Sequence, residues 1–171
     1  LVNDFCQSAY GNAGKAMEKF FGTLHGRLEL TIQDDGKETD WNDSDLLSGN
    51  VADVQNTLKL LNIRYPSEVV SAMDAYLKEA ENISSLSERE KCRLAIVRAE
   101  FDYLKKTTLI AALFKSYVKN PSGLFGKLSD ALKDRDAYID SVSGKDNKIV
   151  PLNGIPLFAG VDKETLKTGG R

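Results

Sequence analysis

The segment at residues 31–50 holds the side chains with the clearest potential for chemistry. Its acidic run carries a charge of −5, because six carboxylates stand against one lysine between residues 34 and 45. Trp41 lies inside this run, and an indole ring beside polar groups can stack on a sugar ring or on a partner protein. We therefore take Trp41, Asp40 and Asp43 as candidate contacts for a ligand or partner. The alternative is a Trp41 that folds back onto its own domain.

The same carboxylates could bind calcium, which prefers oxygen ligands. A twelve-residue calcium loop that begins at Asp34 would place Gly36 and Glu38 at ligand positions. A loop that begins at Asp40 would end at Val51, which cannot bind a metal. Neither register fits, so we expect no metal site and a solvated surface loop.

The sequence lacks the residues and motifs on which most catalytic sites depend. His25 is the only histidine, so a catalytic triad or a histidine metal cluster cannot be assembled in the usual way. We expect His25 at a partly exposed helix position. The sequence has no glycine-rich phosphate loop, zinc-binding helix or Cys-x-x-Cys pair. It therefore predicts no catalytic residue and no cofactor, and an independent enzyme is the least favoured interpretation.

Two residue types bear on the cellular compartment. Cys6 and Cys92 are too far apart in sequence to form a local metal or redox pair. We expect two buried thiols, and a disulfide between two helices is the alternative. Asn42 and Asn82 each begin an Asn-x-Ser pattern, which would be glycosylated only in a secreted eukaryotic protein.

Composition and charge restrict the partners. The 171 residues are 42% hydrophobic and 28% charged, which suits one globular domain with a core. The net charge of −2 and lysines that read as solvated helix charges indicate no nucleic-acid partner. No run of apolar residues is long enough to cross a bilayer, so we expect no membrane partner. The start at Leu1 without a signal peptide suggests a mature product, an excised domain or a fragment, and we expect a secreted or extracytoplasmic location.

The first thirty residues have apolar positions three to four apart, which predicts helix. Because Gly11 and Gly14 interrupt this pattern, we expect a short helix ending near Tyr10 and a longer one from about Asn12 to Leu28.

A second pair of helices is expected after the acidic segment. Residues 51–63 read as a short helix, which Pro66 stops by restricting the backbone before it. Ser67 is expected to cap the helix that follows.

The strongest local signal is the capping box at Ser87 and Glu90. No glycine or proline occurs from Ser87 to Asn120, so we expect one long helix that Pro121 closes. Its apolar arc exceeds half the circumference, which predicts that several helices pack on it. Arg98 belongs to the narrow polar strip, and Leu109 is the one apolar residue there.

Residues 124–141 predict a last helix antiparallel to the long one. Prolines and a glycine break the apolar stretch at residues 149–158, which excludes helix and central strand. The expected fold class is all-α: a helical bundle of about five helices around one long central helix, with an extended C-terminal tail. The expected domains are the bundle at residues 1–144 and the tail at residues 145–171.

Three groups of packing and capping motifs lie between Phe5 and Asp140. They are Phe5-x-x-x-x-Tyr10-Gly11-x-Ala13-Gly14 with Met17 and Phe20, then Tyr65-Pro66-Ser67-Glu68 leading into Ala75-Tyr76-Leu77-Lys78-Glu79-Ala80-Glu81, then Ser87-x-x-Glu90 with Arg93-Leu94, Val97-Arg98 and Phe101-x-Tyr103-Leu104. Together they resemble the C-terminal helical region of a glycoside-hydrolase-like family of unknown function. Residues 31–50, and Asn12 where proline is expected, depart from the pattern.

The resemblance implies that the helices follow a barrel domain, which would hold any catalytic carboxylates and is absent from these 171 residues. The first hypothesis is therefore a non-catalytic accessory domain that supports or lines the cleft of this barrel in a larger carbohydrate-active protein. The alternative is an independent secreted binding or interaction module that uses the acidic 31–50 segment and Trp41. The first hypothesis predicts a sizeable exposed apolar patch, and the second predicts none.

Overall fold

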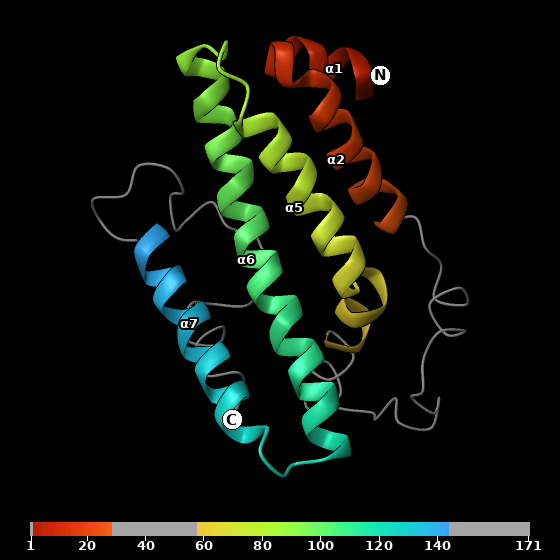
Figure 1. Cartoon of the computed structure of the whole chain (residues 1–171), viewed down its shortest axis with the longest axis vertical. Coiled ribbons are helices and arrows are strands. Elements are labelled where there is room, and N and C mark those ends of the chain that lie inside the picture. Colours follow the sequence, from red (N-terminus) through yellow and green to blue (C-terminus); the bar gives the residue numbers. More distant parts are fainter. Residues whose placement is uncertain (1, 29–57, 144–171) are drawn as a thin grey trace. The chain divides into compact units, whose positions relative to one another are not determined.

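A computed structural model of the chain describes residues 2–28 and 58–143, and these residues form helices and short turns without a strand (Figure 1). The helices delimited at both ends are α1 (Val2–Tyr10), the 3₁₀ helix η1 (Gly11–Ala13), α2 (Gly14–Leu28), α5 (Ser67–Glu81), α6 (Glu88–Lys119) and α7 (Phe125–Ser143). Residues 58–64 are also helical. The all-α class predicted from the sequence is confirmed.

The chain divides into two compact units, Leu1–Phe101 and Asp102–Arg171. Helix α6 contributes to both and runs without a break for 32 residues, which confirms the predicted long helix. The expected boundary at residue 144 and the expected tail at residues 145–171 lie outside the described residues.

In unit 1, α1 and α2 are joined by a tight corner. Gly11 has φ +51°, a left-handed backbone conformation that glycine adopts at no steric cost. The break after Tyr10 is as predicted, but the second helix begins at Gly14, because Asn12 lies in the 3₁₀ turn. The Asn12 amide donates a hydrogen bond to Ser85 Oγ at 2.8 Å.

The core of unit 1 lies between α2, α5 and the first part of α6. Met17, Met73 and Leu77 are fully buried, and Phe20 meets Phe101 edge to face with ring centroids 5.6 Å apart. Figure 1 shows α5 running beside α2 and α6. Truncation of such buried side chains costs about 2–5 kcal/mol each, so this packing fixes the three helices.

The connection into α5 differs from the prediction in one respect. Helical residues 58–64 end as expected, with the Tyr65 amide donating to the Leu61 carbonyl at 2.9 Å. Pro66, in an extended conformation with ψ 161°, occupies the N-cap position of α5. Ser67 is therefore the first helical residue, and its hydroxyl donates to Glu68 instead of capping the helix.

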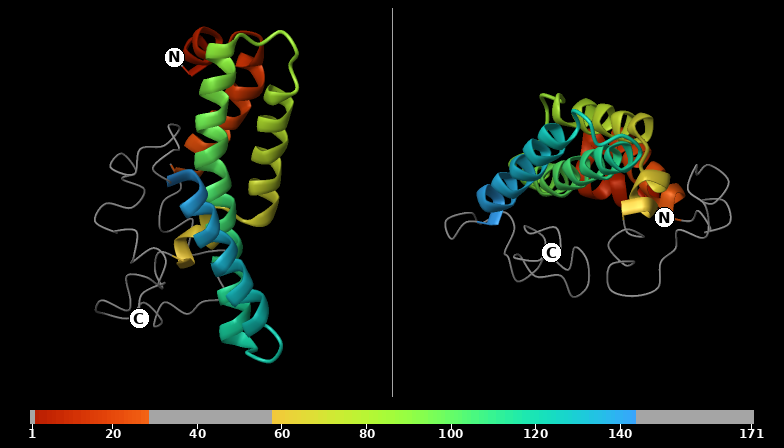
Figure 2. Two further views of the ribbon diagram at one scale, coloured as in Figure 1. Left: turned by 90° about the vertical axis from the view of Figure 1, so that its left-hand side faces the viewer. Right: turned by 90° about the horizontal axis from the view of Figure 1, so that it is seen from below.

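Unit 2 contains a helical hairpin formed by the second part of α6 and by α7, which lie side by side in both Figure 1 and Figure 2. The Lys106 ammonium pairs with Asp134 at 2.5 Å and lies 5.4 Å from the centre of the Tyr138 ring. Leu128 and Ile139 of α7 are buried. The predicted antiparallel return of the last helix is thus confirmed within this unit.

Candidate functional site

The residues singled out for ligand or partner contact lie outside the described part of the chain. Trp41, Asp40 and Asp43, together with the glycosylation candidate Asn42, belong to residues 29–57. Their role stays a prediction. Asn82 lies at the C-cap of α5, where it is exposed, so this second acceptor position is accessible at the surface.

The two cysteines differ in their surroundings. Cys6 is fully buried, whereas Cys92 is exposed, and both are free thiols. Burial, and secondarily the negative charge of Glu18, raises the pKa of the Cys6 thiol. The expectation of two buried thiols is right for Cys6 and wrong for Cys92, and no disulfide joins them. Cys92 lies about 160° around α6 from buried Leu94, away from the helices that pack on that side.

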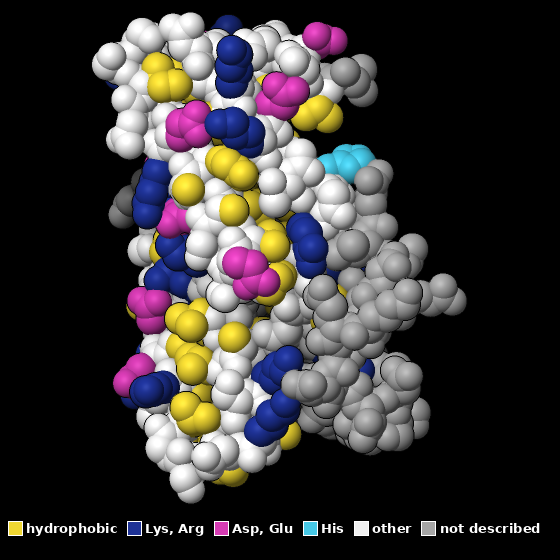
Figure 3. Space-filling view, turned by 45° about the vertical axis from the view of Figure 1, so that its right-hand side comes forward, with side chains coloured by type: hydrophobic (Ala, Val, Ile, Leu, Met, Phe, Trp, Pro, Cys, Tyr) yellow, Lys and Arg dark blue, Asp and Glu magenta, His cyan; other side chains and the backbone are white. Residues whose placement is uncertain are grey.

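The only histidine side chain of the chain, coloured cyan in Figure 3, is exposed in the last turn of α2, as expected for His25. Within residues 2–28 and 58–143, no three His, Cys, Asp or Glu side chains are grouped so that they could hold a metal ion. Among the same residues, no helix is both long and apolar enough to cross a membrane.

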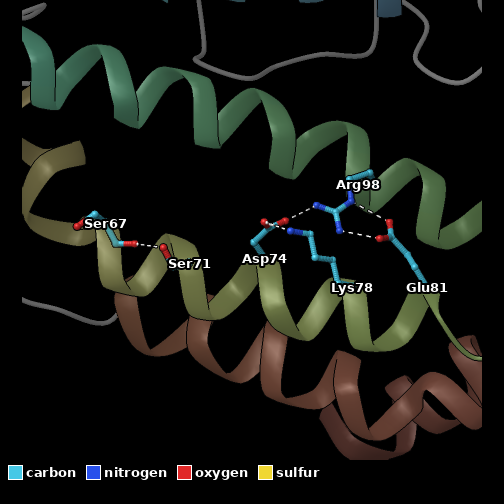
Figure 4. A network of polar contacts seen from close by, with 6 residues as sticks. All are labelled: Ser67, Ser71, Asp74, Lys78, Glu81 and Arg98. Carbon is cyan, nitrogen blue, oxygen red and sulfur yellow. Dashed lines mark hydrogen bonds and ion pairs between the residues drawn. The ribbon is translucent and has the colours of Figure 1, made fainter.

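A group of charged side chains lies between α5 and α6 in the described part of unit 1 (Figure 4). The Arg98 guanidinium forms a fork on Glu81, with Nε donating to Oε1 at 2.8 Å and Nη2 donating to Oε2 at 2.7 Å. Its Nη1 donates to Asp74 Oδ1 at 2.7 Å, while Lys78 approaches Asp74 Oδ2 at 2.9 Å. The guanidinium also lies 5.8 Å from the centre of the Phe101 ring.

This group is suited to holding helices together and poorly suited to acid–base chemistry. Asp74 is nine-tenths buried and accepts from two cations, so its carboxylate is neutralised where it stands. A two-bond Arg–carboxylate fork adds geometric specificity to such a contact. Arg98, predicted on the narrow polar strip of the long helix, is mostly buried, because its guanidinium reaches Asp74 and Glu81 of α5. We assign the cluster a structural role.

A second polar group joins the α1–α2 corner to the start of α6. The predicted capping box is confirmed: the Ser87 amide donates to Glu90 Oε2 at 2.6 Å, and the Glu90 amide donates to Ser87 Oγ at 3.3 Å. The Glu90 carboxylate also fills the space next to Gly11. One turn further along α6, Arg93 donates to the Ala9 carbonyl near the end of α1 at 2.7 Å.

Among the described residues of unit 1, the most exposed aromatic side chain lies on α1. Phe5 is 56% exposed and meets the rings of Tyr10 and Phe21 at centroid distances of 6.2 and 6.1 Å. Val2, one helical turn before Phe5, is 40% exposed. We call Val2, Phe5 and Phe21 the α1 apolar face. It is an ordered apolar surface, because the Phe5 ring is held by two neighbouring rings.

Val2 and Phe5 are among the apolar positions whose spacing predicted this helix, but they are not part of its buried side. Cys6 and Tyr10 form the buried stripe of α1, and Phe5 projects about 100° away from Cys6. A nine-residue helix that packs on one side cannot bury both stripes. Two neighbouring apolar stripes on so short a helix were the sequence signal that one of them would stay exposed.

Comparison with protein-family models, with curated proteins and with solved structures finds no match for this chain.

Proposed function

We propose that this chain is a non-catalytic helical accessory domain of a larger carbohydrate-active, glycoside-hydrolase-like protein, in which it supports or lines the cleft of a barrel domain. The observation that carries the proposal is the α1 apolar face, with Phe5 56% and Val2 40% exposed. Contiguous exposed apolar surface marks sites where another protein surface packs.

The construction of this face supports a docking role. Phe5 is held edge to face against Phe21 and Tyr10, so docking would cost little side-chain entropy. Aromatic side chains that are already ordered are the usual anchors of protein interfaces. A second domain of the same protein is the partner that we propose for it.

The resemblance to the family gives separate support. Several motif residues that carry it pack the described helices: Tyr10, Met17, Phe20 and Phe101 are buried, and Arg93 binds the Ala9 carbonyl. Such a pattern is typical of a domain whose architecture matters more than any reactive group. On the face seen in Figure 3, apolar side chains reach the surface between charged ones.

The test uses the natural protein that contains this chain. Its intact mass is measured first, and we expect a chain much longer than 171 residues. A photoreactive phenylalanine analogue then replaces Phe5 in that full-length protein. Irradiation should join position 5 to a peptide outside residues 1–171, and mass spectrometry of the digest identifies it.

A matched control carries the same analogue at Ile96, an apolar residue of α6 in the same unit that is 47% exposed. Position 96 should give no such product in comparable yield. Equal products at both positions, or products at position 5 only within residues 1–171, would overturn the proposal. A natural chain of 171 residues with glycans would favour the independent binding module, and a glycan array would then test it.

A further inference from the structure

The turn of the α6–α7 hairpin in unit 2 exposes large apolar side chains. Val118 and Phe125 are 59% and 68% exposed, the two largest fractions among large apolar residues in the described part of the chain. The rings of Tyr117 and Phe125 lie 6.4 Å apart between centroids, so the end of α6 and the start of α7 present one surface. The turn between them includes Gly123 with φ +77°.

The same turn carries an excess of positive charge. Residues 111–129 contain three lysines and no acidic residue. Lys115 and Lys119 lie in the last turns of α6, and Lys127 lies in the first turn of α7. Lys119 and Lys127 are exposed. We call this surface the hairpin tip; it consists of Lys115, Tyr117, Val118, Lys119, Phe125 and Lys127.

We propose that the hairpin tip binds the interface of an anionic lipid bilayer, with Val118 and Phe125 in the acyl boundary and the lysines among the headgroups. Exposed apolar side chains favour apolar surroundings, and lysine side chains favour an anionic surface. The interface of an acidic membrane supplies both within a few ångströms. Lysine stems are long enough to lie along the apolar layer while the ammonium groups stay among the headgroups.

The combination argues against other anionic partners. A polysaccharide or a nucleic acid would satisfy the lysines and leave Val118 without an apolar contact. An acidic protein would need a matching apolar groove, whereas a lipid interface adapts to the closed end of a hairpin. The sequence alone predicted no membrane partner and assigned Lys115 and Lys119 to solvent. The exposure of Val118 and Phe125 is the reason to revise that expectation, and the proposed contact is interfacial and does not span the bilayer.

The experiment measures flotation of the full 171-residue chain with vesicles of phosphatidylcholine, with and without phosphatidylserine. We expect binding to the vesicles that contain phosphatidylserine and a decrease as salt is raised. Phe125→Ser should lower the partition coefficient by about tenfold. Each of Lys115→Gln, Lys119→Gln and Lys127→Gln should lower it by roughly fivefold.

Two control variants lie in the same hairpin, away from its tip. Leu109→Ser removes an apolar side chain of α6 that is 52% exposed, and Lys133→Gln removes an exposed lysine of α7. Both should bind vesicles like the unmodified chain, and circular dichroism checks that all variants stay folded. No preference for phosphatidylserine, or equal losses in tip and control variants, would overturn the proposal. So would binding that Phe125→Ser leaves unchanged and that dextran sulfate abolishes, since the tip would then be a site for polyanions in general.

Discussion

The carboxylate of Glu90 occupies the space in which a side chain on Gly11 would have to lie. The two residues are 79 positions apart in sequence, and their contact places the α1–α2 corner against the first turn of α6. Glu90 accepts hydrogen bonds from Ser87 at the same time, so it cannot move away without breaking its capping box. The local signal for a helix start therefore also determines where the corner sits.

Substitution of Gly11 tests this relationship. Gly11→Ala forces a side chain into a left-handed conformation, which costs about 1–2 kcal/mol, and displaces the Glu90 carboxylate as well. We expect a loss of about 2 kcal/mol in the free energy of unfolding, measured by urea denaturation. The matched control is Gly22→Ala in α2, where an added Cβ meets nothing within 4 Å. It should raise stability by up to about 1 kcal/mol, and equal effects of the two changes would contradict the assignment.

Removal of Arg98 tests the charge cluster between α5 and α6. Arg98→Met leaves the largely buried Asp74 carboxylate with fewer partners, and Glu81 loses its fork. Since Arg98 keeps 20% side-chain exposure, we expect about 2–3 kcal/mol of lost stability, below the cost for a fully buried pair. Lys19→Met breaks an exposed pair with Glu79 and should cost less than about 1 kcal/mol.

A second substitution separates burial of charge from loss of packing. Asp74→Asn in the Arg98→Met background removes the buried negative charge, so the double variant should recover part of the lost stability. The measurement is a thermodynamic cycle of urea denaturations. If Asp74→Asn costs as much in the variant background as in the unmodified chain, the two side chains are not energetically coupled.

The parts of the fold that could be predicted from the sequence are those determined by residues close together in the chain. The extent of α6 follows from the Ser87–Glu90 capping box, the absence of helix breakers and the position of Pro121, all of which are close in sequence. The break between α1 and α2 also follows from residues that are close in sequence, Gly11 and Gly14. The start of α5 was placed one residue late, because its cap was assigned to Ser67 and belongs to Pro66.

Exposure depends on the neighbouring helices and could not be predicted from one helix at a time. Cys92 and Arg98 lie on the same apolar-rich helix, and the side on which α5 packs decides that Arg98 is mostly buried and Cys92 exposed. Phe5 is exposed because α1 packs through the side that carries Cys6 and Tyr10. The candidate contacts at Trp41, Asp40 and Asp43 rest on sequence alone.

The thiols should differ in reactivity. Cys92 is exposed, whereas burial and the nearby Glu18 carboxylate raise the pKa of the Cys6 thiol and lower its fraction of reactive thiolate. A disulfide-exchange reagent should therefore label one cysteine in the native chain and both in denaturant. Cys92→Ser should abolish native labelling, and Cys6→Ser should leave its rate unchanged. Rapid native labelling of the Cys92→Ser variant would contradict the burial of Cys6.

The capping box predicts a specific dependence of stability on pH. Hydrogen bonds from the Ser87 amide and hydroxyl lower the pKa of Glu90 in the folded chain below its ordinary value of about 4.3. A carboxyl with a lowered folded pKa stabilises the fold above its unfolded pKa, and this contribution is lost as pH falls through the folded pKa. Glu90→Gln keeps an acceptor without the charge, so it lacks this dependence. The difference in unfolding free energy between the unmodified chain and Glu90→Gln should be constant from about pH 6 to 7 and should change in favour of Glu90→Gln below about pH 5.

Urea denaturation at each pH measures this difference, and Ser87→Ala provides the control. That substitution removes the hydroxyl donor and leaves the amide donor, so it should cost about 1 kcal/mol at neutral pH. It should also weaken the pH-dependent part, because the pKa of Glu90 is then less depressed. A difference between the unmodified chain and Glu90→Gln that stays constant down to about pH 3 would show that the Glu90 carboxylate gains nothing from Ser87 on folding.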